Sequence, residues 1–352
     1  MLAAIVLLLF VLILLGMPIA VAMMGASIVA ILALDIPMNV LAQRVSSGVE
    51  SFPLLAIPLF MLAGGIMNKS GISERLFDFC RSLVGHLRGG LAHVNVLSSV
   101  LMAGISGSSL ADCAATTRVM VPQMEKHGYD RGFSVALTTS SATLSPIIPP
   151  SILMVVYGWQ ANISIGDLFL AGILPGLLIA FCLTLLITLI SIMKQYPKDE
   201  LFNKLRLYSS AKTAAWALLM PVIIIVGFRL GVFTVTEVAA IAVAYSFVVG
   251  KYVYKSLGWR DMGELLVSTA REAASILIII AASAPLAWSL SILQAPQEVV
   301  GWITGLTDNP WAVLLLLNVA LLVIGMFMET IAVIIVLVPI LIPLLNLSLI
   351  HI

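Results

Sequence analysis

The chain has 352 residues, of which 61% are hydrophobic and only 10% are charged, and its formal net charge is +1. Soluble domains carry about 25% charged residues, so the composition excludes an ordinary soluble fold and predicts an all-α polytopic membrane protein. No sustained basic block is present, which argues against nucleic acid as a partner. The three cysteines lie far apart without C-x-x-C spacing, so neither a disulfide framework nor a zinc site is expected.

The first apolar run covers residues 2–34. No basic segment precedes it, and it is too long for the apolar core of a cleaved signal peptide, so we treat it as part of the mature protein. A single straight helix of this length would measure about 50 Å at 1.5 Å per residue. The run is therefore expected to be strongly tilted or broken at Gly16-Met17-Pro18, and residues 1–50 are assigned to an N-terminal scaffold of one or more helices.

Six further membrane spans are expected, because a spanning helix needs about 20 apolar residues. They lie near residues 52–68, 133–158, 168–193, 213–231, 237–250 and 264–293. Positive residues favour the cytoplasmic side of a membrane. Lys and Arg concentrate in the connections 69–88, 194–212 and 251–271, whereas 159–167 and 294–311 contain none. The first three connections are therefore predicted to face the cytoplasm and the other two the outside.

Two segments fit re-entrant helical hairpins, which enter and leave the membrane on one face. Residues 90–124 lie between basic connections and contain Gly104-Ile-Ser-Gly-Ser-Ser-Leu-Ala-Asp112 at their centre. Such a polar turn is tolerated at membrane depth only where it is buried in protein or lines a cavity. Residues 312–345 follow an uncharged connection and carry Gly325 and Glu329 near their centre, so they are expected to enter from the outside.

A weak internal repeat relates the two hairpins. A shift of 217 residues superposes Pro122 on Pro339 and Asp112 on Glu329. Opposite entry of the hairpins favours inverted-topology repeats, with which secondary transporters place a site near the midplane of the membrane. The expected segments are a first repeat at 51–193 with hairpin 90–124 and a broken helix at 133–158, connecting scaffold helices and loops at 194–263, and an incomplete second repeat at 264–352 with hairpin 312–345.

Hydroxyl groups and prolines crowd residues 138–151, in the middle of an otherwise apolar span. Prolines at 146, 149 and 150 remove backbone donors, so upstream carbonyl groups lose their helical partners. A helix break that presents carbonyl and hydroxyl oxygens can coordinate Na⁺. The alternative is a proline kink in which neighbouring hydroxyl groups satisfy the free carbonyls.

Asp112, Glu329 and Arg118 are the charged residues expected deep in the bilayer. A carboxylate costs at least about 2.5–3.5 kcal/mol there, so each acid needs a partner. The functional roles expected for the two acids are coordination of a cation, transfer of a proton or hydrogen bonds that hold a hairpin tip shut. The alternative is that each acid only caps the half-helix that follows it. For Arg118 the two expected roles are binding of an anionic substrate and pairing with Asp112.

Four strings of residues carry a resemblance to a known family. They are Gly85-His-Leu-Arg-Gly-Gly-Leu-Ala-His-Val-Asn95, Gly104-Ile-Ser-Gly-Ser-Ser-Leu-Ala-Asp112, Pro122-Gln-Met-Glu-Lys-His-Gly-Tyr-Asp130 and Pro146-Ile-Ile-Pro-Pro-Ser151. The chain resembles the large membrane subunit of tripartite ATP-independent periplasmic (TRAP) transporters, from about residue 10 to residue 345.

The resemblance implies an elevator-type, Na⁺-driven importer of organic acids such as C4-dicarboxylates, and not an enzyme. It implies a bacterial inner-membrane protein that works with a small four-helix membrane subunit and a periplasmic substrate-binding protein, without a cofactor besides Na⁺. The family's ion sites lie at hairpin tips and helix breaks. Carried over to this sequence, they give Ser106, Gly107, Ser108 and Ser109 in the first hairpin, Ser145, Pro149 and Pro150 in the break, and Glu329 and Thr330 in the second hairpin. Substrate contacts are expected from Arg118, Ser109 and Asp112.

Two other functions compete with this interpretation. A stand-alone Na⁺ or H⁺ symporter of anions would use the same inverted-hairpin plan, whereas a membrane scaffold would leave Asp112, Arg118 and the proline cluster unexplained. The repeat adds one expectation about the C-terminus. Pro149-Pro150 shifted by 217 residues falls beyond Ile352, and residues 346–352 depart from the family's pattern, so a truncated gene product or a partial reading frame is expected.

Overall fold

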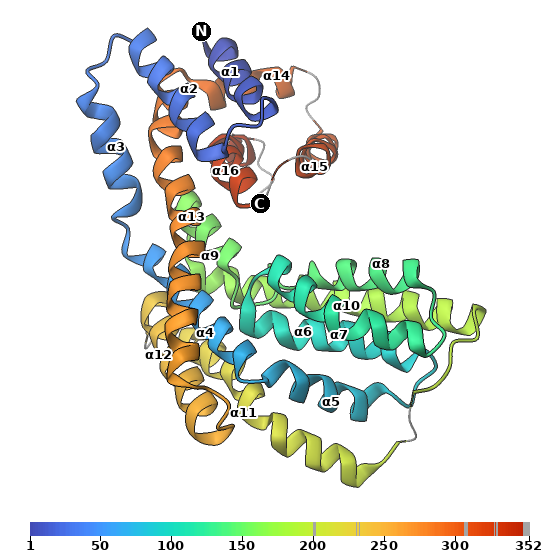
Figure 1. The fold of residues 1–352 in the computed structure, drawn as a ribbon. Coiled ribbons are helices and arrows are strands. Elements are labelled where there is room, and N and C mark those ends of the chain that lie inside the picture. The colour runs from blue at the N-terminus through green and yellow to red at the C-terminus, as the bar shows by residue number, and fades with distance from the viewer. Residues whose placement is uncertain are drawn as a thin grey trace. The chain divides into compact units, whose positions relative to one another are not determined.

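The computed structural model describes residues 1–199, 202–229, 231, 233–305, 309–326, 328 and 330–347. Within these residues every regular element is a helix, and the only β-type pairing is an isolated bridge between Arg88 and Lys198 (Figure 1). The prediction of an all-α chain is confirmed.

The chain divides into two compact units, each described here by itself. The terminal unit comprises Met1–Leu54, Val156–Ile163 and Arg271–Ile352, and the central unit comprises Leu55–Val155 and Ser164–Ala270. Two helices, α9 (Ile152–Ala161) and α13 (Trp259–Ile292), contribute residues to both units. The boundaries of the inverted repeats stay a prediction.

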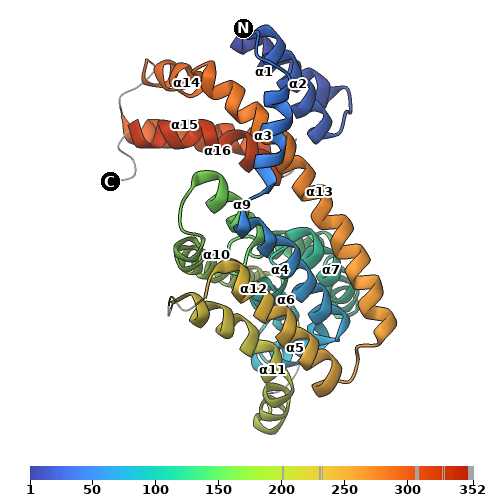
Figure 2. The ribbon, with the colours of Figure 1, turned by 90° about the vertical axis from the view of Figure 1, so that its left-hand side faces the viewer.

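In the terminal unit the long N-terminal apolar run is broken. Helix α1 (Leu2–Leu14) and helix α2 (Ile19–Ala33) pack against each other, as Figures 1 and 2 both show. Gly16 between them has a φ of +81°, a left-handed conformation that glycine adopts without steric cost, and Pro18 is the N-cap of α2. Of the two arrangements expected for residues 2–34, the broken helix is therefore the observed one. Helix α3 (Asn39–Val49) follows.

The C-terminal part of the terminal unit contains α14 (Ala295–Thr304), α15 (Pro310–Gly325) and α16 (Thr330–Leu347). The segment 312–345, which is expected to form the second hairpin, thus contains two helices: α15 ends at Gly325 and α16 begins at Thr330. Helix α16 packs chiefly against α14. Glu329 lies outside the described residues.

The central unit holds most of the expected first repeat. After the 3₁₀ turn Phe52–Leu55, its helices are α4 (Ala56–Lys69), α5 (Ile72–Val84), α6 (Gly90–Ser106), α7 (Ser109–Lys126), α8 (Arg131–Ala142), α10 (Ile165–Met193), α11 (Lys204–Arg229) and α12 (Val235–Val248), the last followed by a π-helical turn. Helices α6, α7 and α8 pack against one another, α10 packs against α6, and α4 packs against α12 (Figures 1 and 2). This bundle positions the hairpin α6–α7 beside the break between α8 and α9.

Five helices among the described residues are long and apolar enough to cross a membrane. These five helices are Phe52–Lys69, Ile165–Met193, Lys204–Arg229, Val235–Val253 and Trp259–Ile292. These match five of the six spans predicted from the sequence, and the sixth, residues 133–158, is divided into α8 and α9. The lengths and compositions support a multi-pass membrane protein.

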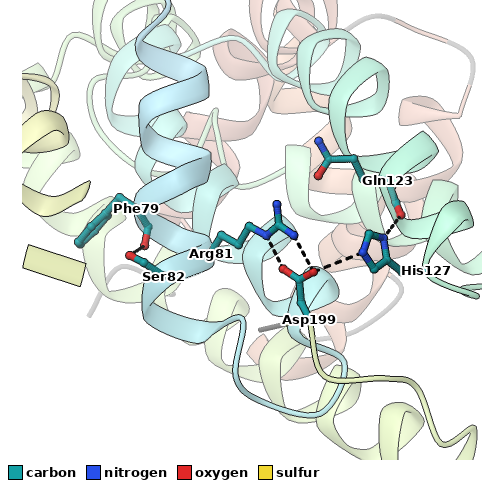
Figure 3. A network of polar contacts seen from close by, with 6 residues as sticks. All are labelled: Phe79, Arg81, Ser82, Gln123, His127 and Asp199. Carbon is teal, nitrogen blue, oxygen red and sulfur yellow. Dashed lines mark hydrogen bonds and ion pairs between the residues drawn. The ribbon is translucent and has the colours of Figure 1, made fainter. Parts of the chain in front are cut away.

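An ion-pair network fixes the base of the α6–α7 hairpin (Figure 3). Asp199, in the connection after α10, accepts hydrogen bonds from Arg81 Nε at 2.5 Å and Nη2 at 2.9 Å, and its Oδ1 lies 3.5 Å from His127 Nε2. The backbone joins in, because Asp199 N donates to Gly85 O and Gly89 N donates to Pro197 O. The connection after α10 therefore binds the ends of both α5 and α7. The Asp199 side chain is only 1% exposed.

Candidate functional site at the hairpin tip and the helix break

The tip of the α6–α7 hairpin is built from three residues. Helix α6 ends at Ser106, Gly107 takes a left-handed conformation with a φ of +59°, and Ser108 is the extended N-cap of α7. The Ser108 hydroxyl accepts a hydrogen bond from Ala111 N at 3.4 Å, and the Ser106 hydroxyl accepts one from Ser108 N at 3.3 Å. Glycine permits the turn, and serine at the N-cap satisfies a free amide of the next helix.

The helix break lies between Ala142, where α8 ends, and Ile152, where α9 begins. The backbone from Thr143 to Ser151 forms turns, because its prolines cannot continue a helical hydrogen-bond pattern. The Ser151 hydroxyl donates to Pro146 O at 2.7 Å and accepts from Met154 N at 3.3 Å. One hydroxyl group thus satisfies a freed carbonyl and an unpaired amide at the start of α9.

The hairpin tip lies directly against the helix break. A Cβ atom placed on Gly107 would lie 2.6 Å from Pro150 O and 3.3 Å from Ser151 Cα, so a larger residue has no room there. On the other side of the tip, a Cβ atom on Gly64 of α4 would lie 3.1 Å from Ser106 Cα. The backbone of the tip is therefore held between α4 and the break.

Asp112 is the charged group at this junction. Its side chain is fully buried in the first turn of α7, and its Oδ2 accepts a hydrogen bond from the Ser145 hydroxyl of the break. The Ser106 side chain lies beside the same carboxyl group. In the described part of the chain, Asp112 Oδ1 and the buried Thr116 Oγ1 one turn later have no hydrogen-bond partner. A buried carboxylate oxygen without a partner is costly, so this site fits a bound cation.

A second buried polar cluster holds α8 against α6. Asn95 Nδ2 donates to Thr138 Oγ1 at 2.7 Å, and Ser141 Oγ donates to Asn95 Oδ1 at 3.1 Å. The Ser99 hydroxyl donates to Ser141 at 3.0 Å. Asn95 and Ser99 are not among the site residues expected from the sequence, although a polar side chain inside an apolar helix is a signal of a buried partner. This cluster fixes the end of α8, from which the break begins.

The hydroxyl-rich run 138–151 therefore has divided roles. Thr138 and Ser141 are used in the cluster with Asn95, and the exposed Thr139 and Thr143 donate to carbonyl groups of their own helix. Ser145 is the hydroxyl of this run that reaches the acid of the hairpin. The hydroxyl groups that satisfy backbone carbonyls and the hydroxyl group that contacts Asp112 are therefore on different residues, and ion binding by this segment stays a prediction.

The structure brings most of the predicted site residues of the first repeat together. The residues at the tip and the break are Ser106, Gly107, Ser108, Asp112, Ser145, Pro149 and Pro150. Ser109, the first residue of α7, is half-buried. Thr330 is the exposed first residue of α16 in the terminal unit, and Glu329 lies outside the described residues.

One of the two contacts left open for Arg118 is not observed. Arg118 is exposed, and in the described structure its guanidinium makes no ion pair with Asp112. A helix turns once every 3.6 residues, so a spacing of six residues puts the two side chains on different faces of α7. Of the two roles expected for Arg118, the pairing with Asp112 is not observed, and the contact with an anionic substrate stays a prediction.

The comparison with protein families decides between the transporter classes. The family model "Tripartite ATP-independent periplasmic transporter, DctM component" matches residues 6–351. This chain belongs to the DctM family of TRAP transporters. The resemblance found in the sequence is thereby confirmed, and the chain is a TRAP large permease.

Three curated relatives of this TRAP permease are themselves named TRAP transporter large permease proteins. The chain is 38% identical over 340 residues to a putative TRAP transporter large permease protein of Haemophilus influenzae, covering 94% of this chain and 78% of the relative. It is 37% identical over 329 residues to the sialic acid TRAP transporter large permease protein SiaM of Vibrio cholerae, with 93% and 77% covered. It is 39% identical over 303 residues to the C4-dicarboxylate TRAP transporter large permease protein DctM of Pseudomonas aeruginosa, with 86% and 71% covered.

A solved structure supports the fold. The YdaH transporter of Alcanivorax borkumensis is similar to this TRAP permease with a TM-score of 0.61, and the match covers 88% of this chain and 73% of that chain. The two sequences are only 18% identical, so the similarity concerns the fold alone.

Proposed function

We propose that this TRAP permease imports a carboxylate-bearing organic acid across the bacterial inner membrane and couples the import to Na⁺. The observation that supports this proposal most strongly is the environment of Asp112, a buried acid where the hairpin tip contacts the helix break. One of its carboxylate oxygens accepts a hydrogen bond from Ser145, and the other has no partner in the described structure. The Na⁺ ion is the coupling ion, and no other cofactor is proposed.

The chemistry of the junction favours a small monovalent cation. One carboxylate balances a single positive charge, and the hydroxyl groups of Ser106 and Ser145 add neutral oxygen ligands. The carbonyl oxygens of Pro149 and Pro150 face the hairpin, since a Cβ atom on Gly104 would lie 3.6 Å from Pro149 O and one on Gly107 would lie 2.6 Å from Pro150 O. Broken helices in transporters use carbonyl groups of this kind to coordinate Na⁺. The corresponding site proposed for the second repeat involves Glu329 and Thr330.

The substrate class follows from the relatives and from Arg118. The relatives named for a substrate are transporters of sialic acid, of C4-dicarboxylates and of 2,3-diketo-L-gulonate. All three substrates are carboxylic acids, so a protein that binds any of them needs a cationic group for the carboxylate. A guanidinium group binds a carboxylate with two parallel hydrogen bonds. We assign this contact to Arg118, helped by Ser109, in an elevator-type movement of the hairpin.

The partners belong to the same proposal. As a TRAP large permease, the chain works with a small four-helix membrane subunit, and a periplasmic binding protein delivers the acid. Coupling to protons in place of Na⁺ is the second candidate, because a buried carboxyl group such as Asp112 is also suited to carry a proton.

Uptake by the permease reconstituted with both partners tests the proposal. Replacing external Na⁺ by K⁺ or choline should abolish uptake of the labelled acid. Full uptake driven by a pH gradient without Na⁺ would overturn the Na⁺ assignment and favour coupling to protons. Full uptake without the binding protein would overturn the proposed partnership.

A further inference from the structure

A buried asparagine of α6 contacts both α7 and α8, the two helices that lead to the proposed ion site. Asn95 is fully buried. Its Nδ2 lies 2.7 Å from Thr138 Oγ1 on α8 and 3.7 Å from Met124 Sδ on α7, and its Oδ1 accepts from Ser141 Oγ at 3.1 Å. None of these atoms is among the ligands proposed for Na⁺, so the transport proposal leaves Asn95 without a role.

The hydrogen bonds around Asn95 run in one direction. Thr138 Oγ1 donates its hydrogen to Ser134 O at 2.8 Å, so it acts as an acceptor toward Asn95. The amide group is thereby oriented with Nδ2 facing Thr138 and Oδ1 facing Ser141. The Ser99 hydroxyl donates to Ser141 at 3.0 Å and extends the chain by one bond. A chain in which every group has its partner holds its members in one geometry.

The hydroxyl groups that contact Asn95 share one side of α8 with Ser145. Residues 134, 138, 141 and 145 have the spacing that places side chains on one helical face, and all four are buried. Ser145 follows α8 directly and is fixed to its end by the backbone. Leu144 N donates to Ser141 O at 3.1 Å, and Ser145 N donates to Ala142 O at 3.2 Å. The position of Ser145 therefore depends on where the end of α8 is held.

The hairpin is joined to α8 at two levels, as α6, α7 and α8 lie side by side (Figure 1). Near the tip, the Ser145 hydroxyl donates to Asp112 of α7. Further from the tip, Asn95 of α6 holds Thr138 and Ser141. Both hydroxyl groups also lie within hydrogen-bond distance of carbonyl groups of α8 itself. Loss of the Asn95 amide would therefore leave α8 helical but remove its attachment to α6.

From these contacts we infer that Asn95 is a positioning residue for the ion site. It holds the end of α8 where the Ser145 hydroxyl meets Asp112, and so it orients the carboxylate toward the cation without contacting the cation. The inference rests on the Na⁺ site of the proposed function. It predicts that loss of the Asn95 amide weakens Na⁺ binding through Ser145 while the helices stay folded.

The Na⁺ dependence of thermal unfolding of the purified permease tests the inference. Asn95→Leu is similar in size and removes both hydrogen-bonding groups. The Na⁺ concentration that gives half of the maximal stabilisation should rise about tenfold, as expected for the loss of two neutral hydrogen bonds. Thr138→Val removes the same contact from α8 with a side chain of equal shape, so it should shift this concentration in the same direction. It tests the contact whether or not Asn95→Leu folds.

Ser98→Ala is the matched control on α6. Ser98 is fully buried, and its hydroxyl donates at 2.9 Å to a backbone carbonyl group of its own helix. Its loss may lower the unfolding temperature, but the half-maximal Na⁺ concentration should not change. An equal shift of this concentration in Ser98→Ala would overturn the inference, because any buried polar group of α6 would then have the same effect.

A double variant separates positioning from a direct effect on the ion. If Asn95 acts through Ser145, the shift in Asn95→Leu combined with Ser145→Ala should equal the shift in Ser145→Ala alone. Multiplied shifts would overturn the inference. A wild-type response to Na⁺ with unchanged half-maximal concentrations in Asn95→Leu and Thr138→Val would overturn this inference alone. A wild type without any Na⁺ response would overturn the proposed Na⁺ coupling together with it.

Discussion

The Ser145 hydroxyl donates a hydrogen bond to the Asp112 carboxylate and thereby joins a helix break to the tip of a helical hairpin. The two residues are far apart in the sequence, on α7 and after α8. Both are fully buried. Since a single donor satisfies only one of the two carboxylate oxygens, the contact orients Asp112 and leaves the other oxygen for a ligand.

The first prediction concerns the Ser145 hydroxyl. Ser145→Ala removes a donor that orients Asp112, so the Na⁺ concentration for half-maximal uptake should rise about tenfold, as expected for one hydrogen bond to a charged group. Thr143→Ala is the matched control, because the exposed Thr143 hydroxyl donates only to Ser140 O of its own helix. Equal Na⁺ dependence of the two variants would show that Ser145 does not act on the ion.

The second prediction uses two left-handed glycines. Gly107→Ala places a methyl group 2.6 Å from Pro150 O and should abolish uptake while the protein still reaches the membrane. Gly128→Ala carries the same left-handed penalty of about 1–2 kcal/mol, but nothing lies within 4 Å of its Cβ atom. Uptake by the Gly128 variant should therefore fall little. A similar loss in both variants would mean that backbone strain, and not contact with the break, explains the defect.

Arg118 should act on the substrate through its planar guanidinium. Arg118→Lys keeps the charge but loses the paired donors, so the KM for the acid should rise about tenfold or more. The Na⁺ dependence should not change, because Arg118 does not contact Asp112. Arg131→Lys serves as the control, since Arg131 is exposed and pairs with the surface residue Glu125. An unchanged KM in Arg118→Lys would show that Arg118 acts on the acid only through its positive charge and not through paired hydrogen bonds.

The fourth prediction concerns stability at the base of the hairpin. Asp199→Asn should lower the free energy of unfolding by about 1–3 kcal/mol, because it removes the negative charge and one of the two buried oxygens that accept from Arg81. Glu125→Gln, which breaks the exposed pair with Arg131, should cost less than about 1 kcal/mol. Thermal unfolding of the purified permease measures both. Equal shifts would show that the Asp199 network contributes no more than a surface ion pair.

Local chemistry decided which parts of the site could be predicted from the sequence. Gly107 and Ser108 have strong local preferences for a left-handed turn and an N-cap, and consecutive prolines predict a break wherever they occur. The contact of the tip with the break depends on packing between distant segments, as does the interaction of Arg81 with Asp199. The Arg118–Asp112 pair, one of two alternatives for Arg118, is not formed because a spacing of six residues puts the two side chains on different faces of the helix. Asn95 was missed because one polar residue leaves an apolar helix pattern intact.

The Na⁺ dependence of thermal unfolding tests the central claim most directly, because it needs neither partner nor substrate. The purified permease is titrated with NaCl and, at equal ionic strength, with KCl, and the same is done with Asp112→Asn. A ligand that binds only the folded state raises the unfolding temperature in a saturable way. Na⁺, and not K⁺, should stabilise the wild type, and Asp112→Asn should fold but lose this response. Equal stabilisation by K⁺, or an unchanged Na⁺ response in Asp112→Asn, would contradict an ion site at the contact of hairpin tip and helix break.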